Sequence, residues 1–154
     1  MAALKRNVVV EAFWKLHPVL YRWSRGRLLG EMAGMDVLIL TTRGRRSGRS
    51  RSTCLTYFSA GDARVVVGSF LGEPRHPAWV HNLRAQPEAE VQCRTERSAV
   101  IAREATGAER DALWAQLVAI QPDYAQYKAN TERLIPLVML EPVGSRAAAP
   151  GTGP

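Results

Sequence analysis

The stretch DVLILTTRGRRSGRSRSTCLTYFSAGDARVVVGS, residues 36–69, decides the fold that we expect for this chain. It holds three short runs rich in the β-branched, aromatic and other apolar residues that favour strands, which lie at 36–42, 52–58 and 64–69. A polar loop separates the first two runs, and Ser59-Ala-Gly-Asp62 has the composition of a turn. The stretch therefore predicts a meander of three antiparallel strands joined by short loops.

The rest of the chain adds strands and short helices around this meander. Further strands are predicted at 90–93, 98–104 and 135–141, and helices at 77–85, 106–120 and 122–131. Thr106-Gly-Ala-Glu109 has the spacing of a capping box that opens the second helix. Six short, mostly consecutive strands indicate an α+β fold, a mostly antiparallel six-stranded barrel with peripheral helices.

We expect one compact domain flanked by two different termini. The chain has 154 residues, a length typical of one domain, which we assign to residues 36–142. Residues 1–35 form an N-terminal amphipathic helical segment, because apolar residues recur at helical spacing between basic residues over 4–29; Pro18 should break it. The Ala/Gly/Pro-rich tail, 143–154, is predicted to be disordered.

Cysteines and hydropathy indicate a protein of the cytoplasm. Cys54 and Cys93 are isolated thiols with no metal-ligand spacing, which suits a reducing compartment and predicts no metal site. The chain has no apolar stretch long enough to cross a bilayer, and its N-terminus lacks the pattern of a signal peptide. We expect a cytoplasmic location, with peripheral attachment to a membrane surface through residues 4–29 as an alternative to packing of that helix on the barrel.

The positive charge is concentrated in one part of the chain. Residues 1–51 hold 11 of the 21 Lys and Arg residues and three acids, a net charge of +8, whereas residues 52–154 carry −1. A local excess of positive charge indicates an anionic partner at one place. The other interpretation is a charge that serves solubility alone.

The loop 43–51 is the strongest local signal for binding. It holds five arginines, Arg43, Arg45, Arg46, Arg49 and Arg51, with two glycines and two serines among them. Guanidinium groups match phosphate and carboxylate oxygens, and glycines let backbone amides approach a ligand. The loop therefore predicts an anion site, with a solvated hairpin tip as the alternative. A nucleic acid is disfavoured as the partner, because the loop has no aromatic residues for base stacking.

Two further pairs of residues are candidates for a site. Trp79 and Asn82 are three apart on a predicted helix and could flank a ring system, although a tryptophan in this position is more often a core residue. Tyr124 and Tyr127 have the same spacing and could present hydroxyl groups to a substrate, or simply pack at the edge of the fold. Nucleotide-binding and hydrolase motifs are absent from the sequence, which favours a cofactor that carries the reactivity.

Ordered blocks of the sequence resemble one known family. Leu40-Thr-Thr-Arg-Gly-Arg-Arg-Ser-Gly48 with Arg51-Ser-Thr53, His76-Pro-Ala-Trp79 with Asn82-Leu83, and Leu140-Glu-Pro142 match its conserved blocks in order. The family is that of the deazaflavin (coenzyme F420)-dependent nitroreductases. The resemblance covers about residues 36 to 142 and implies a split β-barrel related to the FMN-binding proteins.

The resemblance also implies a function and a set of site residues. Reduced F420 would donate a hydride to an electron-poor or conjugated organic acceptor of nitroaromatic, quinone or enone type; FMN is the alternative coenzyme. The cofactor-binding residues that it implies are Arg45, Arg46, Ser47, Arg51, Ser52 and Thr53 for the phosphate and tail, and Val66, Val67, Gly68, Ser69, Trp79 and Asn82 for the ring. Ser69, Tyr124 and Tyr127 would face the substrate.

The chain departs from the family pattern directly after Ser69. Phe70 and Leu71 stand where the family has a small or basic residue and a glycine, so they could narrow the site, change the substrate or weaken coenzyme binding. These residues keep a second interpretation open, a non-catalytic protein of the same fold that binds a flavin, haem or lipid. The oligomeric state, monomer or homodimer, stays open as well.

Overall fold

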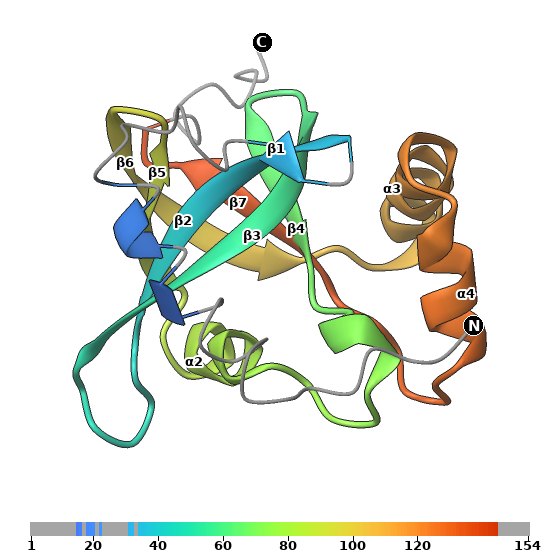
Figure 1. Ribbon diagram of the computed structural model, residues 1–154, viewed down its shortest axis with the longest axis horizontal. Coiled ribbons are helices and arrows are strands. Elements are labelled where there is room, and N and C mark those ends of the chain that lie inside the picture. Colours follow the sequence, from blue (N-terminus) through green and yellow to red (C-terminus); the bar gives the residue numbers. More distant parts are fainter. Residues whose placement is uncertain (1–14, 17, 21, 23–30, 33, 145–154) are drawn as a thin grey trace, which may run out of the picture.

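The computed structural model describes residues 15–16, 18–20, 22, 31–32 and 34–144 (Figure 1). Most of the predicted N-terminal helical segment and all but Val143 and Gly144 of the predicted tail lie outside these residues. The side chain of Leu71 also lies outside the description.

Seven strands form one antiparallel sheet that closes on itself. They are β1 (Glu31–Met32), β2 (Met35–Arg43), β3 (Ser50–Ala60), β4 (Ala63–Val67), β5 (Glu88–Cys93), β6 (Glu96–Glu104) and β7 (Leu137–Pro142). Their order is β1-β2-β3-β4-β7-β6-β5, and β5 pairs with β2 to close a barrel of six strands. The predicted barrel is therefore confirmed, and the short β1 is added at the edge of β2.

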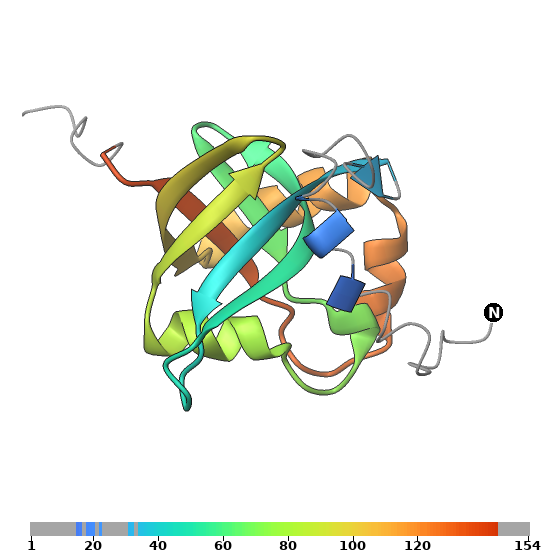
Figure 2. The ribbon, with the colours of Figure 1, turned by 60° about the vertical axis from the view of Figure 1, so that its left-hand side comes forward.

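The helices lie outside the barrel at two places. Helix α2 (Ala78–Ala85) lies across one end, next to the hairpin that joins β2 and β3 (Figure 2). Helices α3 (Gly107–Ile120) and α4 (Asp123–Ala129) lie together on one side of the barrel (Figure 1). The one-turn 3-10 helix η1 (Phe70–Gly72) follows β4 and contacts α4.

Alternation along the strands builds two large hydrophobic clusters and a small third one of Val37, Ile39 and Cys54. Val66 of β4 faces an inner cluster that fills the barrel and includes Leu38, Leu40, Trp79, Val80, Leu83 and Leu140. Its neighbours Val65 and Val67 face the opposite side of the sheet and pack with Leu113, Leu117 and Tyr124 in an outer cluster beneath α3 and α4. The meander thus supplies both cores with alternate residues of the same strands.

Some details of the predicted elements are wrong. The third strand was expected to reach Ser69, but β4 ends at Val67, because the chain turns into η1. The predicted capping box is not formed either: Thr106 is the N-cap of α3 but makes no side-chain capping bond. Glu109 instead accepts two hydrogen bonds from the guanidinium of Arg103, at 2.7 and 2.8 Å.

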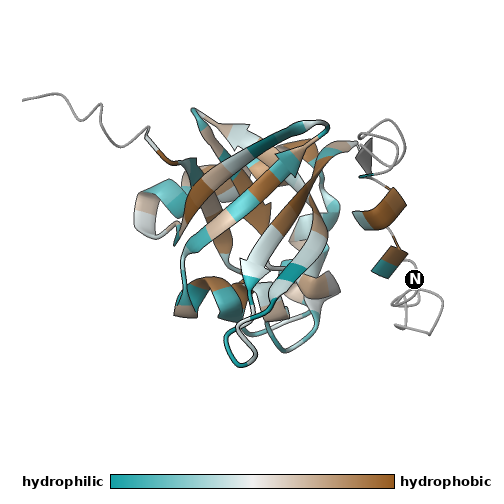
Figure 3. Ribbon diagram, turned by 90° about the vertical axis from the view of Figure 1, so that its left-hand side faces the viewer, coloured by the Kyte–Doolittle hydropathy of each residue, from teal (hydrophilic) through white to brown (hydrophobic). Residues whose placement is uncertain are grey.

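The described part of the N-terminal segment is helical and contacts the barrel at Arg22. The Nη2 of Arg22 donates to the Oγ of Ser52 on β3 at 2.9 Å, and Pro18 is buried. Leu16 and Val19 are 58% and 61% exposed, and the hydropathy colouring shows apolar residues of this segment beside the barrel (Figure 3). None of the helices described has the length and apolar character needed to cross a membrane.

Candidate active site

The arginine loop is a tight hairpin between β2 and β3. The last strand pair is Arg43 with Ser50, and inside it the backbone N–H of Gly44 donates to the carbonyl of Arg49 at 2.8 Å. A Cβ atom on Gly44 would lie 2.6 Å from the Oγ of Ser47, so a side chain there would displace this hydroxyl from its place in the loop. Ser47 in turn accepts a hydrogen bond from the backbone N–H of Arg49. Ser47 therefore shapes the hairpin itself.

Helix α2 holds the start of this hairpin through Asn82. Its Oδ1 accepts a hydrogen bond from the backbone N–H of Arg45 at 3.1 Å, and its Nδ2 donates to the Oγ1 of Thr42 at 3.1 Å. Asn82 and Thr42 are buried, so the hydrogen bond between them is shielded from water, whereas the bond to Arg45 is only partly buried. Asn82 was expected to lie beside the ring of the coenzyme, but both ends of its side-chain amide instead fix the loop.

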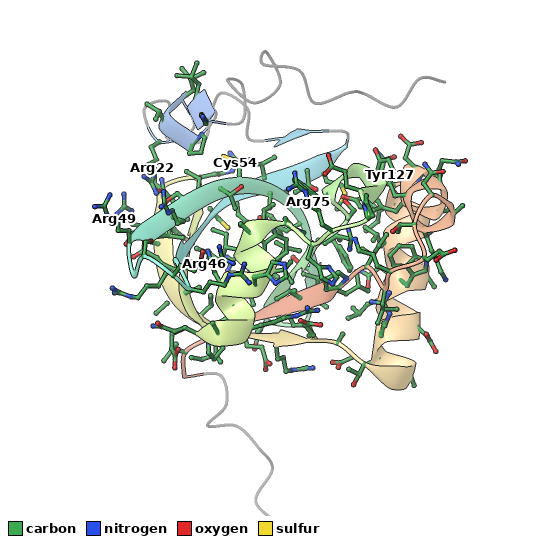
Figure 4. All side chains as sticks on the ribbon, turned by 90° about the horizontal axis from the view of Figure 1, so that it is seen from below. Arg22, Arg46, Arg49, Cys54, Arg75 and Tyr127 are labelled. Atoms are coloured by element: carbon green, nitrogen blue, oxygen red, sulfur yellow. The ribbon has the colours of Figure 1, made fainter. Side chains whose placement is uncertain are left out.

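The guanidinium groups of the loop are exposed and unneutralised. Within the residues that the structure describes, none of the arginines at 43, 45, 46, 49 and 51 forms an ion pair with an acid. Figure 4 places Arg46 and Arg49 at the hairpin end of the molecule, and Arg22 near Arg49. Five like charges on one hairpin repel one another, and a bound anion relieves that repulsion. These residues fit a ligand with an anionic tail.

A split opens in the barrel beside this loop. Strand β3 pairs with β2 from Ser50 to Tyr57, but it pairs with β4 only from Tyr57 to Ala60. Among the described strands, the edge of β3 from 50 to 56 therefore has no partner on the β4 side. The chain after β4 turns away, and the backbone N–H of Gly68 donates to the carbonyl of Pro136 instead.

The turn after β4 is closely packed and carries backbone strain. A Cβ atom on Gly68 would lie 2.9 Å from Cγ of Pro136 and 3.0 Å from Cγ2 of Val80. Ser69 is buried, and Phe70 has a φ of 46°, in the left-handed region where glycine is favoured. Phe70, which stands where the resemblance implied a small or basic residue, thus holds a backbone conformation that is uncommon for a bulky side chain.

The two tyrosines lie on α4, at the other end of the split. The hydroxyl of Tyr124 is 3.3 Å from the Oγ1 of Thr56 on β3, and the rings of Tyr124 and Tyr127 meet edge to face with centroids 5.4 Å apart. Burial raises the pKa of both phenols, so both stay protonated at neutral pH. Tyr124 is buried, whereas Tyr127 is partly exposed and better placed to meet a substrate.

The structure does not bring all the expected site residues to one surface. Arg51 pairs with Thr42, and Thr53 with Leu40, so both face the inner side of the sheet with α2. Ser52 faces the outer side, where its Oγ lies 2.9 Å from the Oγ1 of Thr41. The side chains of Val66 and Trp79 are buried in the inner cluster, so Trp79 is a core residue here. Only backbone atoms of β4 could meet a ring.

One cavity of the barrel lies away from this site. It measures about 340 Å³ and lies at the opposite mouth of the barrel from α2, lined by residues that include Asp36, Tyr57, Arg64 and Cys93. Within the described residues no group of three or more His, Cys, Asp or Glu side chains could hold a metal ion. The geometry of the loop and the split, rather than this cavity, locates the candidate site.

Several residues of the site were missed at the sequence level. Arg22 contacts Ser52 beside the loop, Thr42 anchors Asn82, and Thr56 meets Tyr124. Arg133 contacts the turn that contains Ser69. Each of these contacts joins residues at least 30 positions apart, so no local motif signals them. The pairing of β2 with β3 and the closure of the barrel create these contacts.

The fold and the site together define a class of protein. A closed six-stranded antiparallel barrel that splits beside a hairpin, with helices on the outside, is the architecture of a split β-barrel protein. The comparisons with known proteins then name the family. The sequence model of the F420H(2)-dependent quinone reductases matches residues 14–142, and the chain belongs to this family.

Individual relatives agree with this assignment. An F420H(2)-dependent quinone reductase of Mycobacterium tuberculosis is 36% identical over 143 residues, which cover 89% of this chain and 94% of that protein. A solved structure of an F420-H2 dependent reductase (FDR-A) is 35% identical and has a TM-score of 0.63, over 68% of this chain and 93% of that one. A second structure, a domain-swapped dimer, is 30% identical with a TM-score of 0.66, over 82% of this chain and 94% of that one.

These findings confirm the main expectations from the sequence. The chain is a deazaflavin-dependent oxidoreductase of the split-barrel type, and F420 is the coenzyme of its family. A haem-binding protein of Mycobacterium smegmatis, 19% identical with a TM-score of 0.54 over 78% of this chain and 50% of that one, shares the fold alone. The comparisons therefore favour the redox enzyme over the non-catalytic alternative.

Proposed function

We propose that this protein binds reduced F420 across the split and reduces a quinone-type acceptor there. The observation that carries the proposal is the arginine hairpin: its guanidinium groups are exposed, have no acidic partner among the described residues, and stand where β3 and β4 separate. An anionic tail on the hairpin would direct the attached ring along the split.

The roles of the residues follow from their positions. Arg45, Arg46 and Arg51 would hold the phosphate and the acidic tail, with Ser47 shaping the loop around them. The backbone from Val67 to Ser69 would lie beside the ring, since the side chains of this segment are buried. Asn82 would keep the loop in place, and the outward-facing Ser52 would act together with Arg22 at the edge of the site.

A quinone is the acceptor that the comparisons support best, ahead of a nitroaromatic or an enone. The relatives that are 36% identical are named as quinone reductases. Bound F420H2 supplies the hydride. Tyr127 is partly exposed with a raised pKa, so its neutral hydroxyl can donate a hydrogen bond to an acceptor oxygen that gains electron density. Reduction of the quinone by a hydride and a proton gives the hydroquinone and oxidised F420.

Assembly and membrane contact are open to direct measurement. One relative is a domain-swapped dimer, and we propose that this chain can also form a homodimer. The exposed side chains of Leu16, Val19 and Leu20, flanked by Lys15 and Arg22, also suit attachment to an anionic membrane surface. Flotation with vesicles that contain an anionic lipid tests this, and a triple change of the three apolar residues to Ser should abolish it.

Turnover tests the proposed reaction. Purified protein is mixed under anaerobic conditions with F420H2 and a soluble naphthoquinone, and the fluorescence of oxidised F420 is followed. We expect F420 to appear only when both protein and quinone are present, and Tyr127→Phe to slow the reaction by roughly 10²-fold, the lower range of general acid catalysis. Binding of F420 without any turnover, on quinone, nitroaromatic and enone alike, would contradict the proposal.

A further inference from the structure

Arg133 uses three of its guanidinium nitrogens on one short segment of the chain. Its Nη2 donates to the carbonyl of Ser69 at 2.6 Å, and its Nε donates to the carbonyl of Glu73 at 2.8 Å. Its Nη1 lies 3.1 Å from the Nδ1 of His76. All three partners belong to the segment 69–76, which connects β4 to helix α2.

This contact ties together the two parts of the chain that carry the proposed substrate-facing residues. Ser69 lies in the turn after β4, whereas Arg133 lies between α4, which holds Tyr124 and Tyr127, and strand β7. The turn itself is closed by two backbone hydrogen bonds, from the N–H of Gly72 to the carbonyl of Ser69 at 2.9 Å and from the N–H of Glu73 to the carbonyl of Phe70 at 3.1 Å. The carbonyl of Ser69 thus already has one donor. Arg133 adds a second donor to that same carbonyl.

The chemistry of the contact is specific to arginine. A guanidinium group only donates, so the Nδ1 of His76 must accept, and His76 is neutral with its proton on Nε2. Burial, and next the charge of Arg133, lower the pKa of His76, which agrees with a neutral ring. A lysine could reach one of the three acceptors but has no planar fork to meet all of them.

The turn needs such support because it is strained. Phe70 has a φ of 46°, in the left-handed region that a bulky side chain rarely adopts, whereas Gly72 has a φ of 78°, which glycine adopts without strain. Strained turns of this kind persist only where the surroundings hold them. Salt bridges are not what anchors Arg133, since none is found for it within the described residues; its bonds go to backbone carbonyls and one imidazole.

We propose that Arg133 is a positioning residue of the reaction, which holds the Ser69 turn at a set distance from the helix of Tyr124 and Tyr127. The coenzyme would lie against the turn and the acceptor against the tyrosines, so Arg133 controls how closely the two approach. Misplacement of reacting groups by about 1 Å can cost on the order of 10²-fold in rate. This inference rests on the proposed function, because it assigns a role within the same site.

The test compares Arg133→Met and Arg133→Lys with the wild-type protein. Met keeps an unbranched chain but has no donors, and Lys keeps the charge and one donor site. Arg97→Met is the matched control, because Arg97 is exposed on β6 with only a 3.9 Å pairing to Glu90. For each protein we would measure F420 affinity by fluorescence, kcat and KM with a soluble naphthoquinone, and hydrogen exchange of the amides at 70–73.

The inference predicts a separation of binding from turnover. Arg133→Met should lower kcat at least tenfold and speed amide exchange at 70–73, while the F420 affinity that we assign to the arginine loop changes less than threefold. Arg133→Lys should recover part of kcat, and Arg97→Met should match the wild type. A wild-type kcat in a folded Arg133→Met protein would overturn the role of Arg133 but not the proposed function. A wild-type kcat in Arg133→Lys would do the same. A wild-type protein that never oxidises F420H2 would overturn the proposed function and this role with it.

Discussion

The side-chain oxygen of Asn82 accepts a hydrogen bond from the backbone N–H of Arg45, 37 residues earlier in the chain, at 3.1 Å. The other end of the same amide donates to Thr42, which stands one residue before the last strand pair of the hairpin. One buried side chain of α2 thereby fixes where the arginine loop leaves the barrel. The loop is held in position by the fold before any anion arrives, which lowers the ordering cost of binding.

Removal of this amide should weaken both the fold and the loop. Asn82→Ala leaves the buried hydroxyl of Thr42 without its donor and frees the backbone of Arg45. We expect the free energy of unfolding to fall by about 1–3 kcal/mol. The Kd for F420 should rise by roughly tenfold, which corresponds to about 1.4 kcal/mol. Chemical denaturation and fluorescence titration measure the two effects, with Gln86→Ala, at the exposed end of the same helix, as the control. Unchanged values in both assays would show that the loop does not depend on Asn82.

Gly68 marks the point where β4 leaves the sheet without room for a side chain. Gly68→Ala would place a Cβ atom 2.9 Å from Pro136 and 3.0 Å from Val80, both in the packed interior. Overpacking of this kind costs typically 1–3 kcal/mol, and we expect a loss of stability in that range. Val80→Ala in the same background should restore part of the loss, because it removes one of the two clashing groups. If the losses of stability from Gly68→Ala and Val80→Ala simply add in the double variant, the clash between the two side chains is not the cause.

Acidification should destabilise the fold through His76. Burial is the largest cause of its lowered pKa, followed by the charges of Arg133, Arg84 and His81, and Glu104 opposes them. The unfolded chain has the ordinary histidine pKa of 6.5, so it takes up a proton at a higher pH than the folded chain does. The contribution of neutral His76 to the free energy of unfolding is therefore complete above about pH 6.5. It is lost as the pH falls through the lower pKa that His76 has in the folded chain.

Denaturation curves at pH 7.5 and pH 5.5 measure this effect. His76→Gln, which cannot titrate, should show a smaller drop in the free energy of unfolding between the two conditions. A residual drop should remain, because burial and the charges of Arg45 and Arg84 lower the pKa of His81 in the same direction. Equal pH dependence in the wild type and His76→Gln would contradict the neutral ring beside Arg133.

The two cysteines should differ sharply in reactivity. Cys54 is fully buried, and burial raises its pKa to about 12, with Arg22 opposing the shift. Cys93 is only partly buried and lines the cavity at the far mouth of the barrel, and burial raises its pKa as well. A disulfide reagent should titrate one thiol per native chain, faster as the pH rises above 8, and two thiols in denaturant. Two reactive thiols in the native protein would show that the β2–β3 face is open.

The fold was largely predictable because strand patterns are local. Apolar runs of four to seven residues located six of the strands, and turn composition located their connections. The ends of the strands were harder to predict. Strand β3 begins at Ser50, two residues earlier than expected, because its first residues pair with β2 although they are polar. Thr106 and Glu109 had the right spacing for a capping box, but Arg103 of β6 competes for the carboxylate.

The site was predictable in its chemistry and less so in its geometry. The density of arginines between 43 and 51 marked the anion site from composition alone. The sequence could not show that Ser52 and Arg51 face opposite sides of the sheet, because this follows from the register with β2. Nor could it show the contact of Arg133 with Ser69, since that contact joins residues 64 apart.

Equilibrium titration of F420 at several salt concentrations tests the central claim most directly, that the arginine hairpin grips the anionic tail of the coenzyme. We expect micromolar binding, about −8 kcal/mol, to the wild type, with an affinity that falls as salt rises. The double change Arg46→Ala and Arg51→Ala should weaken binding at least tenfold and flatten the salt dependence, whereas Arg97→Ala should do neither. Wild-type affinity and salt dependence in the double variant would contradict the account.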